Sequence, residues 1–378
     1  MTVLSRVSKS ARCGVALFGT LAFISISGHS SQAAESLDQI KKDAVAATAP
    51  VKDWDGPTTG PKAAKGKSIV YVADTQTNAG VAGSSAGAKE AAAAIGWKFQ
   101  LIDGQNTASG EATAFEQAIA LKPDGIIIGS LDATQFKPLF KRAADQGIKM
   151  VSWHSSAAPG PIAEVPEVFW NLSTDPYQIA NIAGKYAVSH SDGKANAVLL
   201  TDPQFAIVNT KTKGEKEGIE ACDTCKVLSV ENAPYTQISQ RMPSLMSALL
   251  QRYGSKLGYV LAFNDLYFDF SVPTLRAAGI AADAPPFLIS AGDGSASAYE
   301  RIRKGQYQIG TVPEPLNLHG WQAIDELNRA FAGEKPSGYV TKVHLVIKDN
   351  IDADGGKDNK FDPDNGYRDQ YKKIWGVN

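Results

Sequence analysis

Short apolar runs alternate along the chain with longer segments in which apolar residues recur every three or four positions. Most of the runs are almost continuously hydrophobic, which is typical of parallel strands that are buried on both faces. The segments between them have the spacing of helices that bury one face. We expect strands at residues 68–74, 98–102, 125–129, 148–153, 197–201, 226–230, 258–263 and 287–291. We expect helices at residues 81–95, 111–121, 134–146, 176–190, 213–221, 236–253, 297–304 and 318–331.

The same order of elements begins at residue 68 and again at about residue 196. This repetition predicts an α/β protein with two similar doubly wound, Rossmann-like domains. A length of 378 residues fits two such domains better than one. With 38 basic and 39 acidic residues the formal net charge is −1, so the composition does not point to a nucleic-acid partner.

Polar residues follow the apolar runs, at the points where the predicted strands end. They are Asp74-Thr75-Gln76, Ser130-Leu131-Asp132, His154-Ser155, Asp202, Asn264-Asp265 and Gly292-Asp293. In open α/β sheets, ligands bind beyond the carboxyl ends of the strands. The sequence therefore predicts a ligand site built from these loops.

The first 34 residues have the features of a cleavable secretory signal peptide. Three basic residues precede an apolar stretch at residues 14–26, which is too short to span a bilayer. A small-x-small cleavage site follows at residues 31–33. Cys13 precedes the apolar stretch, whereas the cysteine of a lipoprotein would follow it. We therefore expect a soluble, exported protein without a lipid anchor.

Two further segments lie outside the regular pattern. Residues 35–65 form a separate N-terminal extension, with a predicted helix at 36–47 and then a loop rich in proline, glycine and lysine. Residues 352–366 are acidic and rich in turn residues. They lack the D-x-[DN]-x-[DN]-G run and the final glutamate of a calcium-binding loop. We expect a solvated acidic loop there.

Cys222 and Cys225 are the two cysteines that follow the predicted signal peptide. Because exported proteins meet an oxidising environment, we expect a disulfide between them. The alternative is a redox-active Cys-x-x-Cys site. A redox motif would open a helix after a strand, whereas this pair closes the helical pattern at 213–221 and leads into the strand at 226–230.

Five short stretches in a characteristic order carry a family resemblance. They are Asn78 nine residues before Gly87-Ala-Lys-Glu-Ala, Asp103-Gly-Gln-Asn-Thr-Ala, Pro123-Asp-Gly-Ile-Ile-Ile, Phe263-Asn264-Asp265 and Ala291-Gly292-Asp293-Gly294. With them, residues 66–347 resemble the periplasmic sugar-binding proteins of the ribose- and galactose-binding type, which are the solute receptors of ABC importers.

The resemblance implies the type I periplasmic binding fold, in which two lobes are joined by a three-segment hinge and close on a ligand. It places the hinge segments near residues 173–175, 314 and 343. The N-terminal lobe would comprise residues 66–173 plus 315–342, and the C-terminal lobe residues 174–314 plus 343–378. It also implies a periplasmic monomer without cofactor or metal, which delivers a monosaccharide or sugar alcohol to an inner-membrane ABC permease.

The resemblance further implies ligand contacts, and it shows departures from the family. Asn78, Asn264 and Asp293 match family residues, Tyr235 takes the place of an aromatic residue, Glu314 that of a hinge glutamine and Lys211 that of an arginine. Trp153 and His154 stand where ribose binders have aspartate and arginine, and Gly80 and Val81 where they have two stacking aromatic residues. The ligand therefore need not be ribose.

Sugar chemistry supports a similar set of residues independently of the resemblance. Carboxylates and amides grip pairs of hydroxyl groups, and aromatic rings cover the apolar C–H faces. Some of these residues have alternative structural roles, since Asp293 and Asn264 could cap helices and Trp153 could belong to the core. The candidate ligand-binding residues are Asn78, Asp132, Trp153, His154, Phe205, Lys211, Tyr235, Asn264, Asp293 and Glu314.

Two alternative functions remain open at this point. Gly83-Ser84-Ser85-Ala86-Gly87 fits the G-x-S-x-G motif of a secreted α/β hydrolase, and Asp293 and His319 follow in the hydrolase order. A nucleophile elbow places its serine directly after a strand, whereas Ser85 falls inside the predicted helix at 81–95, so we expect a protein that is not an enzyme. The other alternative is a receptor that feeds a chemosensor or binds a furanose-like signal.

Overall fold

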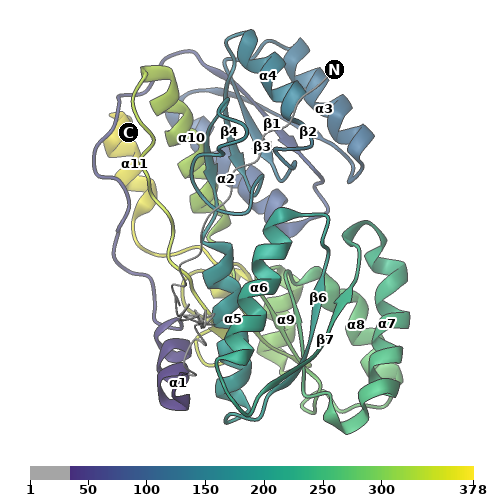
Figure 1. The fold of residues 1–378 in the computed structure, drawn as a ribbon. Coiled ribbons are helices and arrows are strands. Elements are labelled where there is room, and N and C mark those ends of the chain that lie inside the picture. Colours follow the sequence, from purple (N-terminus) through teal and green to yellow (C-terminus); the bar gives the residue numbers. More distant parts are fainter. Residues whose placement is uncertain (1–34) are drawn as a thin grey trace, which may run out of the picture. The chain divides into compact units, whose positions relative to one another are not determined.

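The computed structural model describes residues 35–378, so the predicted signal peptide, with Cys13 and its cleavage site, lies outside the described residues. Two separate sheets form the centres of two lobes, which we call the first and the second lobe (Figure 1). Helices connect the parallel strands within each lobe. The predicted α/β fold with two doubly wound halves is therefore confirmed.

The first lobe contains five parallel strands in the order β2-β1-β3-β4-β5. The strands are β1 (Ser68–Ala73), β2 (Lys98–Asp103), β3 (Gly125–Gly129), β4 (Lys149–Trp153) and β5 (Val168–Leu172). The helices are α2 (Ala79–Ile95), α3 (Ala108–Ala120), α4 (Lys137–Asp145) and α10 (Leu316–Ala332). Helix α10 comes from much later in the chain and packs against α2 and β4.

The second lobe contains six strands in the order β11-β10-β9-β8-β6-β7, of which β11 alone runs antiparallel to its neighbour. The strands are β6 (Asn196–Thr201), β7 (Lys226–Asn232), β8 (Tyr259–Ala262), β9 (Phe287–Ser290), β10 (Gln308–Thr311) and β11 (Val346–Ile347). The helices are α5 (Pro176–His190), α6 (Ala206–Glu220), α7 (Ile238–Tyr253), α8 (Leu266–Ala277) and α9 (Ala296–Lys304).

Each sheet separates two hydrophobic cores, which explains why the strands are apolar at nearly every position. Ile69 and Tyr71 of β1 pack beneath α2 and α10, whereas Val70 and Val72 pack beneath α3 and α4. The second sheet divides its residues in the same way, between a core with α5 and α6 and a core with α7 and α8. Both faces are thus buried, as in other parallel sheets.

Helix α10 approaches α2 closely because both helices carry glycine at their contact. A Cβ atom added to Gly320 would lie 2.2 Å from the backbone nitrogen of Ala88, and one added to Gly87 would lie 2.4 Å from the carbonyl oxygen of Asn317. These obstacles are backbone atoms, so even a methyl group fits only if the two helices move apart. The close contact fixes the position of α10 on the first lobe.

Replacing Gly320 by alanine is expected to lower the free energy of unfolding by about 1–3 kcal/mol, because the added methyl group overpacks the contact between α10 and α2. Urea denaturation followed by far-ultraviolet circular dichroism would measure the change. Ser244→Ala, at an exposed position of α7, is the control and is expected to change stability by less than about 0.5 kcal/mol. Because alanine favours a helix over glycine by about 1 kcal/mol, a stabilised Gly320→Ala variant would contradict the close contact.

The two ends of the described chain differ from the predicted division into lobes. Helix α1 (Leu37–Ala46) packs on α5 of the second lobe, and the chain then runs to the first lobe. Helix α11 (Tyr367–Trp375), expected with the second lobe, instead packs against α10 and α2 of the first lobe. The reason is aromatic packing, because Trp375 stacks on Trp321 with ring centroids 5.5 Å apart. The terminal segments at residues 47–63 and 348–366 therefore also run from one lobe to the other.

Three local features complete the description of residues 35–378. Cys222 and Cys225 form the predicted disulfide directly after α6, with Cα atoms 5.4 Å apart. The acidic segment 352–366 is only partly solvated, since Asp352, Asp358 and Asp364 are exposed, whereas Asp354 is buried and accepts a hydrogen bond from the Val51 amide over 3.0 Å. None of the helices within this range combines the length and apolar character that a membrane span requires.

Candidate ligand-binding site

A cavity lies between the carboxyl ends of the strands of the two lobes. Both lobes contribute side chains to its wall, and most of them follow directly after a strand or begin a helix. This is the position at which ligands bind in open α/β sheets. The lining residues are Asp74, Asn78, Ser130, Asp132, His154, Ser155 and Ser156 of the first lobe, and Phe205, Ala206, Ile207, Val208, Lys211, Tyr235, Phe263, Asn264 and Asp293 of the second.

The structure brings eight of the ten candidate residues to the cavity wall. Trp153 and Glu314 lie behind the wall instead. The Trp153 ring stacks on the His154 ring, with centroids 3.6 Å apart, and its Nε1 donates to Nδ1 of His319 over 3.1 Å. The eight that line the cavity are Asn78, Asp132, His154, Phe205, Lys211, Tyr235, Asn264 and Asp293.

Two of the asparagines at the wall also organise the helices that follow them. Asn78 caps α2, because its Oδ1 accepts the Gly80 amide over 2.8 Å. Asn264 accepts the Leu266 amide over 3.2 Å at the start of α8. In each case one amide oxygen is used by the backbone while the rest of the side chain faces the cavity. Helix capping and ligand contact are therefore compatible roles for both residues.

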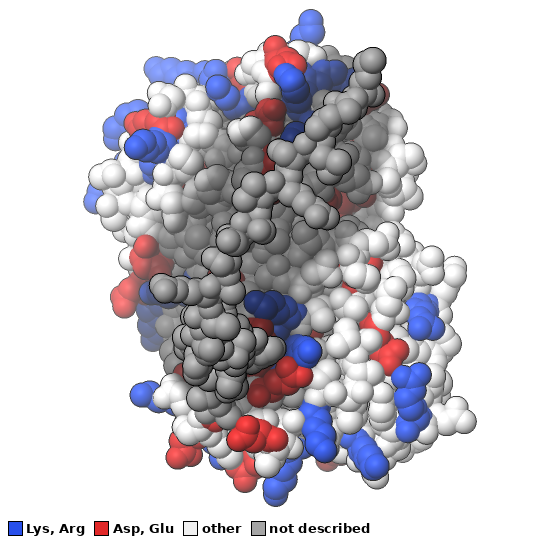
Figure 2. All heavy atoms as spheres, viewed as in Figure 1, with Lys and Arg blue, Asp and Glu red and all other residues white. Residues whose placement is uncertain are grey.

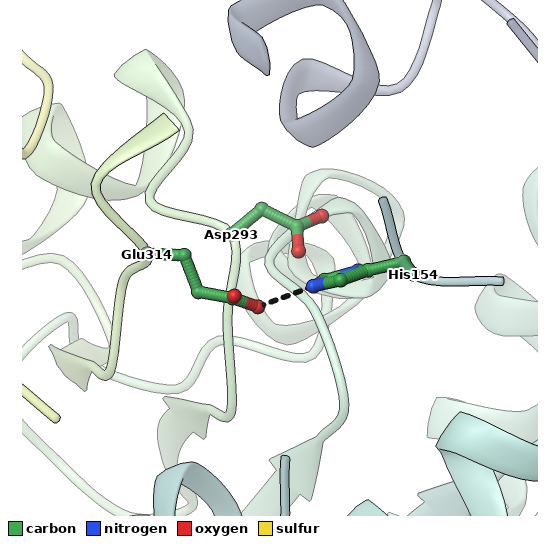
Figure 3. A group of neighbouring side chains, drawn as sticks. All are labelled: His154, Asp293 and Glu314. Carbon is green, nitrogen blue, oxygen red and sulfur yellow. Dashed lines mark ion pairs between the residues drawn. The ribbon is translucent and has the colours of Figure 1, made fainter. Parts of the chain in front are cut away.

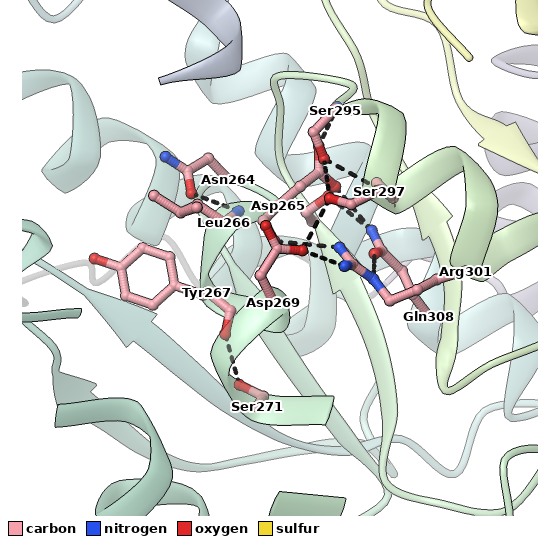
Figure 4. Close-up of polar contacts among 12 residues, drawn as sticks. Asn264, Asp265, Leu266, Tyr267, Asp269, Ser271, Ser295, Ser297, Arg301 and Gln308 are labelled. Carbon is pink, nitrogen blue, oxygen red and sulfur yellow. Dashed lines mark hydrogen bonds and ion pairs between the residues drawn. The ribbon is translucent and has the colours of Figure 1, made fainter. Parts of the chain in front are cut away.

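Asp265 holds the loop that carries Asp293 (Figure 4). Its carboxylate accepts hydrogen bonds from the Gly294 amide over 2.8 Å and from the Ser295 amide over 3.0 Å. It also accepts from Gln308 Nε2 over 2.8 Å and from the hydroxyl of Ser290. Every donor is buried or half-buried, and Asp265 itself is 2% exposed. The network fixes the backbone directly after the cavity residue Asp293.

Asp293 reaches across from the second lobe to the beginning of α2 in the first. A Cβ atom added to Gly80 would lie 2.9 Å from the carboxyl carbon of Asp293 and 2.8 Å from the ring of Trp153. Within residues 35–378, the Asp293 carboxylate accepts no hydrogen bond that meets ordinary geometry. Burial raises its pKa to about 6, although Lys211 and His154 oppose the shift.

A compact group of charged side chains lies at one end of the cavity (Figure 3). His154 Nε2 is 2.8 Å from Glu314 Oε1, and Lys211 Nζ is 4.0 Å from the same oxygen while it donates to the Phe263 carbonyl over 3.2 Å. Burial opposes ionisation of Glu314, but His154 and Lys211 outweigh it and lower its pKa to about 2.

The same group has oxygen and nitrogen atoms of the kind that bind metal ions. Ligand atoms of His154, Asp293 and Glu314 lie within 4.8 Å of one another. However, His154 already faces Glu314, and the Lys211 ammonium occupies the neighbourhood of the same carboxylate. A divalent cation would be repelled by that ammonium. We therefore interpret the group as an ion-pair cluster.

Glu314 also connects the three predicted hinge segments behind the cavity. Its Oε2 accepts the Thr174 amide over 2.9 Å. The Thr174 hydroxyl bonds the Thr341 hydroxyl, which lies 2.9 Å from Nε2 of His319 at the start of α10. Burial lowers the pKa of His319 to about 4, so this imidazole is neutral at pH 7. Glu314, directly behind the cavity wall, is thus linked through Thr174 to the segments that join the lobes.

Comparison with known proteins agrees with this architecture. The periplasmic binding protein domain matches residues 69–335. The chain belongs to the periplasmic binding protein family. A curated protein of Rhizobium meliloti, whose name assigns it to rhizopine binding, is 23% identical over 263 residues, which cover 66% of this chain and 82% of the relative.

Two solved structures share the fold of this periplasmic binding protein. A galactofuranose-binding protein has a TM-score of 0.67 at 19% identity, with 82% of this chain and 99% of that chain covered. An ABC transporter solute-binding protein from Agrobacterium vitis, bound with alpha-D-tagatopyranose, has a TM-score of 0.69 at 18% identity, with 78% and 99% covered. At these identities the likeness establishes the fold alone.

The hydrolase motif has a structural explanation in this periplasmic binding protein. Ser85 lies inside α2, and its hydroxyl donates to the Ala82 carbonyl over 3.0 Å. His319 is hydrogen-bonded to Trp153 and Thr341, not to Ser85. Gly87, the last residue of the motif, provides the close contact between α2 and α10. The motif thus reflects helix packing, and the hydrolase alternative is not supported.

Sequence reasoning missed one acidic residue of the cavity, Asp74, although it noted the residue at the end of a predicted strand. Asp74 follows β1, is 9% exposed and accepts a hydrogen bond from the Thr75 amide. Burial raises its pKa well above the ordinary value, and the nearby acids Glu111, Asp293 and Asp103 add to the shift. Its position at a strand end was the available signal, and Ser130 and Ser155 carried the same signal.

Proposed function

We propose that this protein is a non-catalytic periplasmic receptor of an ABC importer, which closes on a monosaccharide or sugar alcohol and delivers it to a membrane permease. The observation that carries the proposal is the cavity between the lobes, because both lobes supply polar side chains to its wall. A concave site with a few convergent polar groups suits a small molecule. Family membership and the sugar ligands named for the two related structures support the same conclusion.

The residues of the cavity suit a polyhydroxylated ligand. Asn78, Asn264 and Asp293 offer amide and carboxylate groups that pair with adjacent hydroxyls. Phe205 and Tyr235 of the second lobe offer flat surfaces for the C–H face of a sugar ring. On the first lobe, Gly80 leaves no space for an aromatic side chain, since Asp293 and Trp153 already fill it. We infer that the ligand is covered by aromatic rings from one lobe only.

Export to the periplasm and action as a monomer belong to the same proposal. The family match supports a periplasmic location. On the described surface that Figure 2 shows, acidic and basic side chains are interspersed, in keeping with the formal net charge of −1. The permease would recognise the pair of lobes in the closed arrangement, in which His154 of the first lobe meets Glu314.

A ligand panel tests the proposal. Thermal shift with monosaccharides and alditols should raise the melting temperature for at least one compound, because a ligand that binds the folded state stabilises it by mass action. Asp293→Ala should then weaken binding of that compound by about 1–3 kcal/mol in calorimetry, since hydroxyl groups of the buried ligand lose their acceptor. Asp283→Ala, at an exposed position, is the control. Chemical conversion of the bound compound would contradict a receptor.

A further inference from the structure

Acidic side chains surround one side of the cavity without basic partners. Asp74 lines the cavity, and the nearby acids Glu111, Asp103 and Asp293 raise the pKa of its carboxyl group. Asp132, which also lines the cavity, raises the pKa of Glu111 in the same way. Within residues 35–378, no lysine or arginine is among the groups that contribute most to the pKa of Asp74. The first-lobe wall of the cavity therefore carries two acidic side chains, Asp74 and Asp132, with further acids close behind Asp74.

Two of these carboxylates face the cavity with free acceptor capacity. Asp74 is 9% exposed, and the single hydrogen bond that its carboxylate accepts from the described residues comes from the adjacent Thr75 amide. Asp293 is 8% exposed, and its carboxylate has no such bond within residues 35–378. A buried carboxylate without a hydrogen-bond donor or cation is unfavourable. The empty acceptor positions point to a group that the ligand itself supplies.

The basic side chains of the cavity are engaged at its other end. Lys211 donates to the Phe263 carbonyl and lies near Glu314, while His154 lies 2.8 Å from Glu314. Lys211 and His154 also lower the pKa of Asp293 and so favour its ionised form. Neither is among the groups that contribute most to the pKa of Asp74. The acidic side chains without a basic partner are thus located around Asp74.

We propose that the ligand is a polyol that carries an ammonium group, such as an amino sugar, an amino alditol or an aminocyclitol, and that this group binds Asp74. The inference rests on the proposed receptor function and specifies its ligand class. An ammonium group has three donors and a positive charge, so it fills the free acceptor positions of Asp74 and of the facing Asp293. A neutral hydroxyl in the same place offers one donor and leaves the charge uncompensated.

The ionisation of the two carboxylates predicts the pH dependence. Burial raises the pKa of Asp293 to about 6 and also raises that of Asp74 well above its ordinary value. The groups that face Asp74 are Asp103, Glu111, Asp293, Tyr71 and Tyr235, and those that face Asp293 are Lys211, His154, Glu314, Asp265 and Tyr235. An ammonium ligand needs the ionised carboxylates, so its affinity should rise between pH 5.5 and 7.5. A neutral polyol has no such requirement.

Calorimetry with matched pairs of compounds tests the inference. The pairs are D-glucosamine with D-glucose, 1-amino-1-deoxy-D-sorbitol with D-sorbitol, and an inosamine with the inositol of the same configuration. For at least one pair, the amine should bind about ten- to a hundredfold more tightly than the neutral compound at pH 7.5, as expected of charge-assisted hydrogen bonds. The preference should shrink at pH 5.5. Asp74→Asn should remove it, whereas Asp283→Asn, at an exposed position far from these acids in the chain, should retain it.

The outcomes separate this inference from the proposed function. If neutral compounds bind as tightly as the amines in every pair, or more tightly, the ammonium ligand is wrong while the receptor function stands. If Asp74→Asn keeps the full preference for the amine, the assigned position of the ammonium group is wrong. If no member of any pair binds, and the wider panel of sugars and alditols also fails, the receptor function itself is contradicted.

Discussion

Replacing Glu314 by alanine is expected to lower the free energy of unfolding at pH 7 by about 3–5 kcal/mol, because it breaks a buried charged pair and leaves the partner unpaired. Glu314 is fully buried, and its carboxylate faces His154 and the Lys211 ammonium, which loses its counter-charge. The Thr174 amide, inside the hinge, loses its acceptor as well. Urea denaturation of the variant and the wild type would measure the difference.

The pH dependence of this effect has a definite sign. The pKa of Glu314 is lowered from 4.5 to about 2 in the folded protein. Its contribution to stability is therefore fully present above pH 4.5 and is lost as the pH falls toward 2. The difference between wild type and Glu314→Ala should shrink between pH 5 and pH 3. Glu314→Gln, which keeps an acceptor for the Thr174 amide, should lose less stability than the alanine variant. A loss below about 1 kcal/mol at pH 7 for Glu314→Ala would contradict the role assigned to the cluster.

A second large effect is expected at Asp265. Its replacement by alanine removes the acceptor of four donors, namely two backbone amides, the Ser290 hydroxyl and the Gln308 amide. Since a buried donor without a partner is unfavourable by about 1–3 kcal/mol, we expect a loss of about 3–5 kcal/mol in total after partial relaxation.

Asp265 should influence binding as well as stability, because its bonds to residues 294 and 295 hold the loop of Asp293. Calorimetry at a temperature at which the variant is still folded would measure the ligand affinity. Asp265→Asn keeps the size of the side chain and one acceptor oxygen, so its loss of stability should be intermediate. Asp283→Ala, at an exposed position, should leave both quantities unchanged. Wild-type affinity in the folded Asp265→Ala variant would show that the Asp293 loop needs no support from Asp265.

Within the described residues, the hydrophobic pattern predicted eight of the eleven strands and missed β5, β10 and the two-residue strand β11. Strand β5 contains Asn171, which is fully buried and accepts the Ser152 hydroxyl over 2.8 Å and the Ser155 amide over 3.0 Å. Strand β10 contains Gln308, which is buried in the network of Asp265. Hydrogen bonds from distant parts of the chain make these residues suitable for the interior, and a local pattern contains no information about them.

The candidate site was predictable to the extent that strand ends mark it. That rule found Asp132, His154, Asn264 and Asp293, and it also pointed to Asp74, which was not selected. It placed Trp153 at the cavity as well, because the rule gives the end of a strand but not the direction of a side chain. The packing of α11 on the first lobe was unpredictable for a similar reason. The spacing of its aromatic residues predicts a buried face, but not the lobe that covers it.

The terminal segments that pass between the lobes affect how the cavity can open. Residues 47–63 and 348–366 contact each other through Val51 and Asp354, and Asp55 contacts Lys342 near the third hinge segment. When the two lobes separate, these contacts either stay intact, so that both segments move together, or they break. We therefore expect the ligand-free protein to sample a narrower range of open arrangements than three hinge segments alone would permit. Less conformational entropy is then lost on closure, which favours tight binding of a small ligand.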